Sequence, residues 1–188
     1  MSAHRQAQAD ADFRGFMTAR APALRRTAYV MCGDWHHAED LVQIAFTKLY
    51  AAWARVGASG GLDSYLRRIL ANAVIDESRR GFRRKEKPMA TLPDVEGRDT
   101  SSSELRPVLL RALASVPAKQ RACLVLRYFD DASVEEVAEI LGCREGTVKS
   151  QTSRGLENLR RALRDLDPEL CAALGDKPTD EPALQLMS

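Results

Sequence analysis

The chain has 188 residues, of which 45% are hydrophobic and 29% are charged, and its formal net charge is only +2. This composition predicts one ordinary domain or two small ones and argues against a disordered chain, while the balanced charge says nothing about partners. No apolar run reaches the length of a membrane span, and the polar start lacks the basic-then-apolar order of a signal peptide. We therefore expect a cytoplasmic protein without membrane insertion.

The first block of the chain is predicted to form three helices and no strand. One helix begins near Phe13 and continues past Pro22, a second covers residues 37–56, and a third covers residues 63–84. Apolar residues recur at helical spacing in all three, as in helices packed around a shared core. The side chains expected on the inner faces are Leu24, Ala28, Met31, Val42, Phe46, Leu49, Trp53, Leu66, Ile69, Leu70, Ala73 and Val74.

Between the first two helices, the sequence CGDWHH at residues 32–37 places a thiol and two imidazoles close together. Gly33 and Asp34 interrupt the helix there, which removes the i, i+4 spacing of a helical metal site. We interpret the segment as an inter-helix turn and predict neither a metal nor a cofactor. Because no two cysteines form a CxxC pair, all four are interpreted as small buried or half-buried hydrophobic residues: Cys32, Cys123, Cys143 and Cys171.

The third helix ends in a basic run. From Tyr65 to Lys87 there are eight Lys or Arg residues against three acidic ones, and most of the basic residues lie beyond Asp76. The helix macrodipole stabilises basic residues at this end, so an isolated run of this kind is typical of a solvated terminus. A nucleic-acid contact becomes the better interpretation only if the rest of the chain also indicates one.

Residues 87–104 contain two prolines, a glycine and a serine run, which predicts an irregular linker. Helical patterns resume after it, so the predicted fold class is all-α, with two small helical domains joined by a flexible linker. We set the first domain at residues 8–87, the linker at 88–103 and the second domain at 104–164. Residues 165–188 carry six acidic residues against one lysine, with three prolines, and are predicted to form a flexible acidic tail.

The second domain contains the pattern of a helix-turn-helix. Ser133, with Glu136 three residues later, predicts a capping box and hence a helix start. Gly142 supplies the left-handed conformation that ends a helix in a tight turn, and a second helix begins near Glu145. The apolar residues expected on the packed sides are Val134, Val137, Ala138 and Leu141, then Val148, Thr152, Leu159 and Leu163, supported by Leu109, Leu113, Leu124 and Leu126 of two upstream helices.

Charge is segregated between these two helices. Residues 133–141 hold three acidic residues and no basic one, whereas residues 145–164 hold five basic residues and two acidic ones. The side chains that point away from the packed side of the second helix are Ser150, Ser153, Arg154 and Arg161, with Lys149 and Gln151 at the flanks. Such a pair is suited to placing only its second helix against DNA, although helical hairpins with small turns are also common in structural roles.

Taken in order, four segments resemble the extracytoplasmic-function sigma factors, the two-domain transcription initiation factors of bacteria, and among them the actinobacterial sigma-E-like group. They are AEDLVQIAF at 38–46, SYLRRILANAVIDESRR at 64–80, LPD at 92–94 in the linker, and the helix-turn-helix at 133–163. The resemblance covers nearly everything from Phe13 to Leu166. It implies a promoter-melting domain, a linker threaded through the polymerase and a domain for the −35 element, with core RNA polymerase and promoter DNA as partners.

The resemblance also implies roles for individual residues of the first domain. Asp40, Gln43 and Ile44 match the part that docks on the clamp helices of polymerase, and Ile44 stands where family members commonly carry an acid. The loop VGASGGLD at residues 56–63 matches the loop that captures a flipped base, where glycines allow close backbone approach. The face that meets the −10 element matches Arg68, Asn72, Arg79, Arg80 and Arg83.

In the second domain, the resemblance implies that the −35 element is read by Arg144, Lys149, Ser150, Gln151, Ser153 and Arg154. Arg144 stands where many relatives carry a capping Ser, and Gln151 where many carry Arg. These differences imply a base preference of the protein's own, because glutamine and arginine favour different base edges. Many relatives are held inactive by an anti-sigma factor, so such a partner is also expected, although no residue here identifies it.

Three other classes of function compete with this one. The chain has no P-loop, GxSxG, HExxH or Gly-rich dinucleotide turn, which argues against an enzyme. A stand-alone helix-turn-helix transcriptional regulator is the main alternative, but its first block would need a ligand pocket, receiver domain or dimer interface. A protein-binding adaptor would have no affinity for DNA. We expect a non-enzymatic initiation factor that binds core RNA polymerase, recognises −35 and −10 elements and helps to melt DNA.

Overall fold

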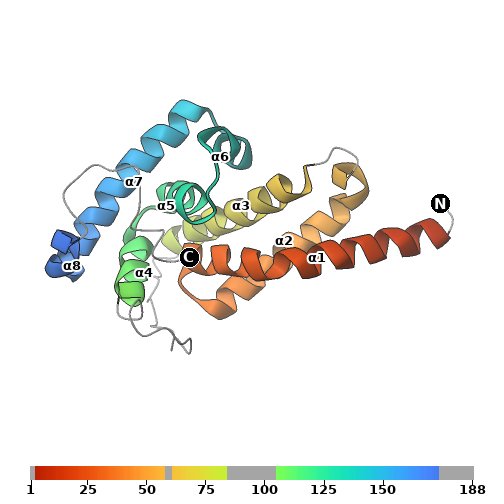
Figure 1. Cartoon of the computed structure of the whole chain (residues 1–188), viewed down its shortest axis with the longest axis horizontal. Coiled ribbons are helices and arrows are strands. Elements are labelled where there is room, and N and C mark those ends of the chain that lie inside the picture. Colours follow the sequence, from red (N-terminus) through yellow and green to blue (C-terminus); the bar gives the residue numbers. More distant parts are fainter. Residues whose placement is uncertain (1–2, 58–60, 84–104, 174–188) are drawn as a thin grey trace.

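The computed structural model of the protein describes residues 3–57, 61–83 and 105–173, and these residues are helical apart from short turns (Figure 1). The first half consists of α1 (Ala3–Cys32), α2 (Trp35–Gly57) and α3 (Leu62–Arg83). The second half consists of α4 (Leu105–Ser115), α5 (Ala118–Leu124), the π-helical turn η1 (Val125–Phe129), α6 (Val134–Leu141), α7 (Glu145–Leu166) and α8 (Pro168–Ala173). The all-α prediction is confirmed. The predicted linker at 88–103 lies outside the described residues.

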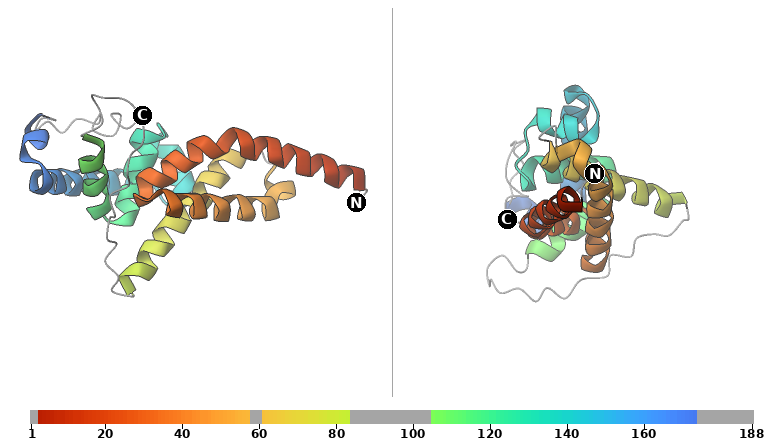
Figure 2. Two further views of the ribbon diagram at one scale, coloured as in Figure 1. Left: turned by 90° about the horizontal axis from the view of Figure 1, so that it is seen from below. Right: turned by 90° about the vertical axis from the view of Figure 1, so that its right-hand side faces the viewer.

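Helix α1 begins at Ala3, well before the predicted start near Phe13. Alanine and glutamine, which favour helix, make up much of this added segment. Contacts with α2 also hold it, since the Tyr50 hydroxyl donates a hydrogen bond of 2.8 Å to Asp10. The Phe13 ring packs edge-on against Tyr50 and Trp53, with centroids 4.9 and 5.1 Å apart. Pro22 lies within α1, which bends along its length (Figure 2).

The CGDWHH segment is a turn, as predicted. Gly33 has φ of 79°, a left-handed conformation that ends α1, and the backbone N–H of His37 donates to the Asp34 carboxylate at 2.7 Å at the start of α2. The Cys32 thiol donates to the Asp34 carbonyl at 3.2 Å, and burial raises its pKa to about 11. A thiol with this pKa stays protonated near neutral pH. All four cysteines are free, with Cys123 buried and the others half-buried, which confirms their interpretation.

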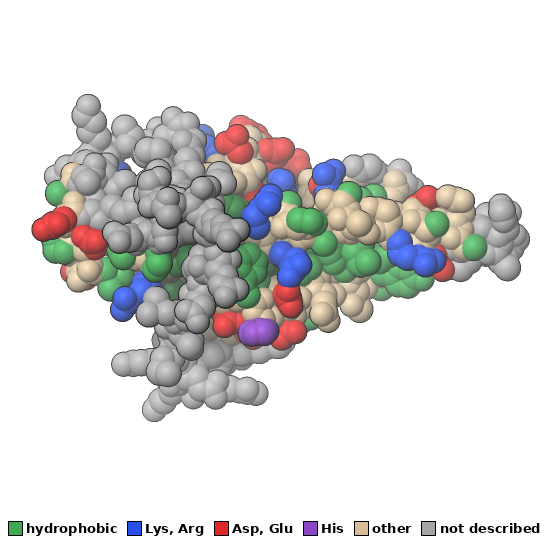
Figure 3. Space-filling view, turned by 60° about the horizontal axis from the view of Figure 1, so that its bottom comes forward, with side chains coloured by type: hydrophobic (Ala, Val, Ile, Leu, Met, Phe, Trp, Pro, Cys, Tyr) green, Lys and Arg blue, Asp and Glu red, His purple; other side chains and the backbone are tan. Residues whose placement is uncertain are grey.

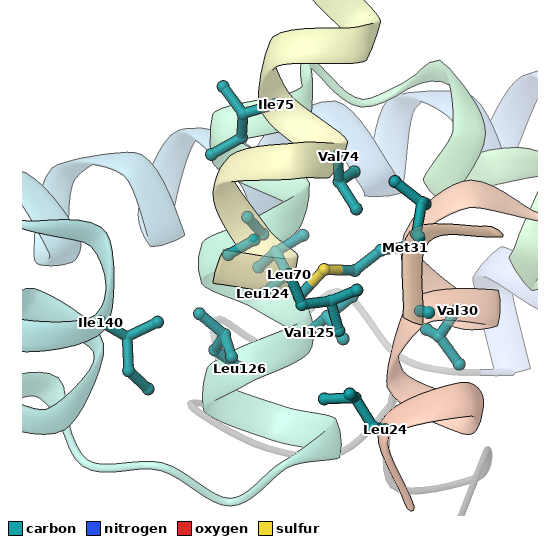
Figure 4. Close-up of a cluster of buried hydrophobic side chains, with 14 of the residues drawn as sticks. Leu24, Val30, Met31, Leu70, Val74, Ile75, Leu124, Val125, Leu126 and Ile140 are labelled. Atoms are coloured by element: carbon teal, nitrogen blue, oxygen red, sulfur yellow. The ribbon is translucent and has the colours of Figure 1, made fainter. Parts of the chain in front are cut away.

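The two halves share one hydrophobic core. Every side chain expected on the inner faces of the first block is buried except Trp53 and Ala73, which are half-buried. Helix α3 lies beside α5, with α6 packed across it (Figure 1). In the interface, Met31 of α1 and Leu70 of α3 face Leu124 and Val125 of the second half (Figure 4). Burial of apolar surface therefore stabilises the contact between the halves as well as each half by itself.

Part of the predicted acidic tail is helical. Residues 165 and 166 belong to α7, and α8 follows directly after Asp167. Pro168 occupies the first position of α8, where its missing N–H costs no helical hydrogen bond. The Cys171 thiol lies 3.9 Å from the Arg160 carbonyl, which holds α8 against α7. Residues 165–166 and 168–173 of the predicted tail are thus helical, and residues 174–188 lie outside the described part of the chain.

Candidate nucleic-acid and polymerase interfaces

The helix-turn-helix is built as its local sequence predicts. The Ser133 hydroxyl accepts a hydrogen bond of 3.1 Å from the Glu136 N–H, and the Ser133 N–H donates to the Glu136 carboxylate at 2.7 Å, completing the capping box. Gly142 ends α6 with φ of 61° and ψ of 43°. The Cys143 N–H donates back to the Ala138 carbonyl at 3.0 Å, which closes the turn. These hydrogen bonds fix the angle at which α7 leaves α6.

One face of α7 packs against the other helices of the second half. Val148, Leu159 and Leu163 are buried there, as predicted, while Thr152 is half-buried. Gly155 is also buried, because α5 approaches so closely that a β-carbon would lie 3.1 Å from Leu124 Cγ. Gly155 was not among the predicted packing residues, although a glycine on the packed side of a helical pattern is itself a signal of close approach.

The other face of α7 carries the side chains predicted to read DNA. Lys149, Ser153 and Arg154 are exposed, as is Ser150, whose hydroxyl donates to the Thr147 carbonyl at 3.0 Å. Two further predicted residues, Gln151 and Arg144, lie at the half-buried flank and at the N-cap of α7, respectively. The Arg144 side chain makes no capping hydrogen bond. The Thr147 N–H donates to the Arg144 carbonyl at 2.8 Å, and the positive end of the α7 dipole lies at this N-terminus, which suits a phosphate group.

The predicted −10 residues of α3 lie in two different environments. Asn72 and Arg79 are exposed, and Arg79 pairs with Asp76 across 3.4 Å. Arg68 lies against the turn of the helix-turn-helix, with one guanidinium nitrogen 3.0 Å from the position of a β-carbon built on Gly142. The side chains of Arg80 and Arg83 and the loop residues 58–60 lie outside the described residues.

The three predicted polymerase-docking residues share the outer face of α2. Asp40 and Gln43 are exposed, and Ile44 is 44% exposed, a large fraction for an isoleucine. Their spacing of three and four residues places them side by side. Phe46 is instead 7% exposed and belongs to the core, as predicted. The patch is thus a polar pair beside an apolar side chain, a composition suited to a protein interface.

Comparison with known proteins decides the family. The model of Sigma-70 region 2 matches residues 16–84, and the model of Sigma-70, region 4 matches residues 107–159. The chain is 36% identical over 159 residues to the RNA polymerase sigma-E factor of Streptomyces antibioticus, covering 83% of this chain and 88% of that one. The chain belongs to the extracytoplasmic-function sigma factors. Sigma factors of this family are transcription initiation factors that direct RNA polymerase to promoters, and they are not enzymes.

Other relatives of this sigma factor agree. It is 33% identical to the ECF RNA polymerase sigma factor SigW of Bacillus subtilis over 157 residues, covering 73% of this chain and 81% of SigW. Its structure resembles that of the sigma factor RpoE from Bartonella quintana, solved in complex with the anti-sigma factor NepR. The TM-score is 0.64 and the identity 29%, over 81% of this chain and 97% of that one. The family and the fold are therefore supported by sequence and by structure.

Among the described residues on the face seen in Figure 3, basic side chains do not form one continuous patch. Basic side chains occur there as separate groups among acidic and hydrophobic ones. This distribution agrees with a net charge of only +2.

Within the described ranges of the chain, no helical segment combines the length and hydropathy of a membrane span.

Proposed function

We propose that this sigma factor divides its work among three helices: α2 binds core RNA polymerase, α3 meets the −10 element, and α7 reads the −35 element. In this assignment, residues 8–87 form the promoter-melting domain, 88–103 the linker and 104–164 the −35 domain. The single observation that carries the proposal is the two-sidedness of α7. One side is buried against the other helices of the second half, and the opposite side presents exposed polar and basic side chains from the first turns of α7 onward.

Reading of the −35 element falls to the exposed side of α7 and its half-buried flank at Gln151. An arginine can donate two hydrogen bonds to the O6 and N7 atoms of guanine, and a glutamine can pair with the N6 and N7 atoms of adenine. We assign these chemistries to Arg154 and Gln151. Lys149, Ser150, Ser153 and the uncapped N-terminus at Arg144 are suited to phosphate contacts, which position the helix without reading sequence.

Melting and capture of the −10 element fall to side chains of α3, of which Arg68, Asn72 and Arg79 are exposed. Arg68, Arg79, Arg80 and Arg83 would bind phosphates of the separated strand, while Asn72 offers donors and acceptors to an exposed base. The glycine-rich loop before α3 would receive the flipped base. Docking on polymerase falls to Asp40, Gln43 and Ile44, supported by their joint exposure on α2.

The proposal is tested by reconstituted transcription with core RNA polymerase and a set of bacterial promoters. We expect specific initiation that depends on paired −35 and −10 elements, and no tight operator binding by the protein alone. Tight, autonomous binding to duplex DNA without polymerase would favour a stand-alone regulator. Folded protein that forms no complex with core polymerase in gel filtration would overturn the proposal.

We further place this sigma factor in the cytoplasm, where its relatives act on RNA polymerase.

An anti-sigma factor is a proposed partner, supported by the structural neighbour, which was solved with one. Co-purification of the tagged full chain from cells before and after stress would test this, with a stoichiometric second protein, absent after stress, as the expected result.

A further inference from the structure

The first turn of α3 is tied to α1 by a two-pronged ion pair. The Arg20 guanidinium of α1 lies against the Asp63 carboxylate, with Nε 2.7 Å from one oxygen and a terminal nitrogen 2.8 Å from the other. A bidentate pair of this kind fixes the orientation of both groups as well as their distance. Arg20 is itself held over the Phe16 ring, 5.8 Å from its centroid. The pair therefore sets the position of Asp63 relative to α1.

A second contact holds the same turn from another side. Arg55, in the last turn of α2, places its guanidinium 6.0 Å from the centroid of the Tyr65 ring and donates to the Tyr65 hydroxyl at 3.5 Å. At about 100° per residue, Tyr65 lies within about 20° of Asn72 around α3, whereas Asp63 lies roughly opposite Asn72. Arg55 thus braces the side of the turn that belongs to the −10 surface, and Arg20 braces the side that faces α1.

The hydrophobic core holds this turn only loosely. The first N–H groups of a helix have no intrahelical partner, so initial turns fray readily. Leu62 is half-buried, Asp63 and Ser64 are exposed, and burial of α3 is nearly complete only at Leu66, which is 2% exposed. The turn is the described end of the base-capture loop, defined as residues 56–63. Its position therefore decides where a captured base would lie relative to the rest of α3.

We propose that Arg20 and Asp63 are positioning residues for base capture, because their ion pair holds the first turn of α3 in place before DNA arrives. This inference rests on the proposed function of α3 in melting the −10 element. A turn that is already ordered loses little conformational freedom when an extruded base binds, so less binding free energy is lost on ordering. The pair does not itself face the −10 surface, because Asp63 lies on the side of α3 opposite Asn72.

Another ion pair of α1 provides a matched control. Arg25 pairs with Glu39 of α2, and the side chains of that pair are 48% and 45% exposed, against 51% and 51% for Arg20 and Asp63. The Arg25 pair, however, joins α1 to α2 rather than to the first turn of α3. Because exposed ion pairs contribute little to global stability, Arg20→Gln and Arg25→Gln should both melt at the same temperature as the natural protein.

The local effect is measured by hydrogen–deuterium exchange of the free, full-length protein at the amides of residues 61–66. We expect Arg20→Gln and Asp63→Asn each to speed this exchange about threefold, as the loss of an exposed ion pair predicts, and Arg25→Gln to leave it unchanged. Arg20→Asp combined with Asp63→Arg keeps the pair with its charges exchanged, and should restore slow exchange. Unchanged exchange in both single variants of the pair would contradict the proposal.

The functional effect is measured with core RNA polymerase and a promoter that carries 2-aminopurine in the non-template strand of the −10 element. We expect Arg20→Gln and Asp63→Asn to slow the fluorescence rise about threefold at saturating holoenzyme, with unchanged affinity for the closed promoter. Normal opening in both variants would refute a role in base capture. Slow opening in Arg20→Gln alone would mean that Arg20 contacts DNA directly, which also refutes it. If exchange responds but the natural protein opens no promoter, the ion pair still holds the turn and the proposed function fails.

Discussion

A substitution at Gly155 tests the close contact between α5 and the recognition helix α7. In Gly155→Ala, the new methyl group would meet Leu124 Cγ at 3.1 Å, Leu124 Cδ1 at 3.2 Å and Gln120 Cβ at 3.3 Å. All three distances fall short of the roughly 3.5 to 4.0 Å at which carbon atoms attract one another. Leu124 has no exposed surface and sits in the shared core, so it has little room to move away.

Two effects of opposite sign decide the result. Replacing glycine by alanine within a helix stabilises it by about 1 kcal/mol. Forcing an extra carbon into a packed core costs about 1 to 3 kcal/mol. Because both neighbours belong to one rigid element, we take about 2 kcal/mol for the steric cost, which leaves a net loss of about 1 kcal/mol. For a protein of this size that corresponds to a fall in melting temperature of about 2 to 4 °C.

Gly146 provides the matched control within the same helix, since nothing lies within 4 Å of a β-carbon placed there. Gly146→Ala should therefore keep the propensity gain and raise stability by up to about 1 kcal/mol. Thermal and urea unfolding of both variants, followed by circular dichroism, measures the difference, expected at about 2 kcal/mol. Equal stabilisation by the two substitutions would refute the claim that α5 and α7 are in rigid contact at Gly155.

Other substitutions test the cap, the polymerase patch and base reading. Ser133→Ala removes the capping hydroxyl and should cost about 1 kcal/mol of unfolding free energy in urea titrations; no loss would mean that the capping box contributes nothing. Asp40→Ala combined with Gln43→Ala should weaken polymerase binding without lowering the melting temperature, whereas a collapse of stability with unchanged affinity would make their role structural. Arg154→Ala should cost about 1 to 3 kcal/mol of promoter binding in the holoenzyme at fixed salt and relax preference at one −35 base pair. Arg161→Ala should cost less and affect all sequences alike, and equal losses for both would refute base reading by Arg154.

The local features of the site could be predicted because they depend on neighbours in sequence. The capping box joins Ser133 to a residue three positions on, and Gly142 needs only its own freedom to adopt positive φ. The period of 3.6 residues per turn then determines which side chains of α7 share a face. The buried Val148 and the exposed Arg154 follow from that period, and so does the outward-facing patch on α2.

Contacts between residues far apart in the chain could be learned only from the tertiary structure. Ile140 was not expected in the core, yet it is 1% exposed because α6 is covered by α7 on one side and by α3 on the other. Likewise, the N-terminal turns of α1 are stabilised partly by Tyr50, forty positions away. Periodicity reports which face of a helix is apolar, but it does not report which other element covers that face. The approach of the Arg68 guanidinium to within 3.0 Å of a β-carbon position on Gly142, and the hydrogen bond from Thr27 to Asp130, arise only when the two halves pack together, since neither residue of either pair carries a local signal of its partner.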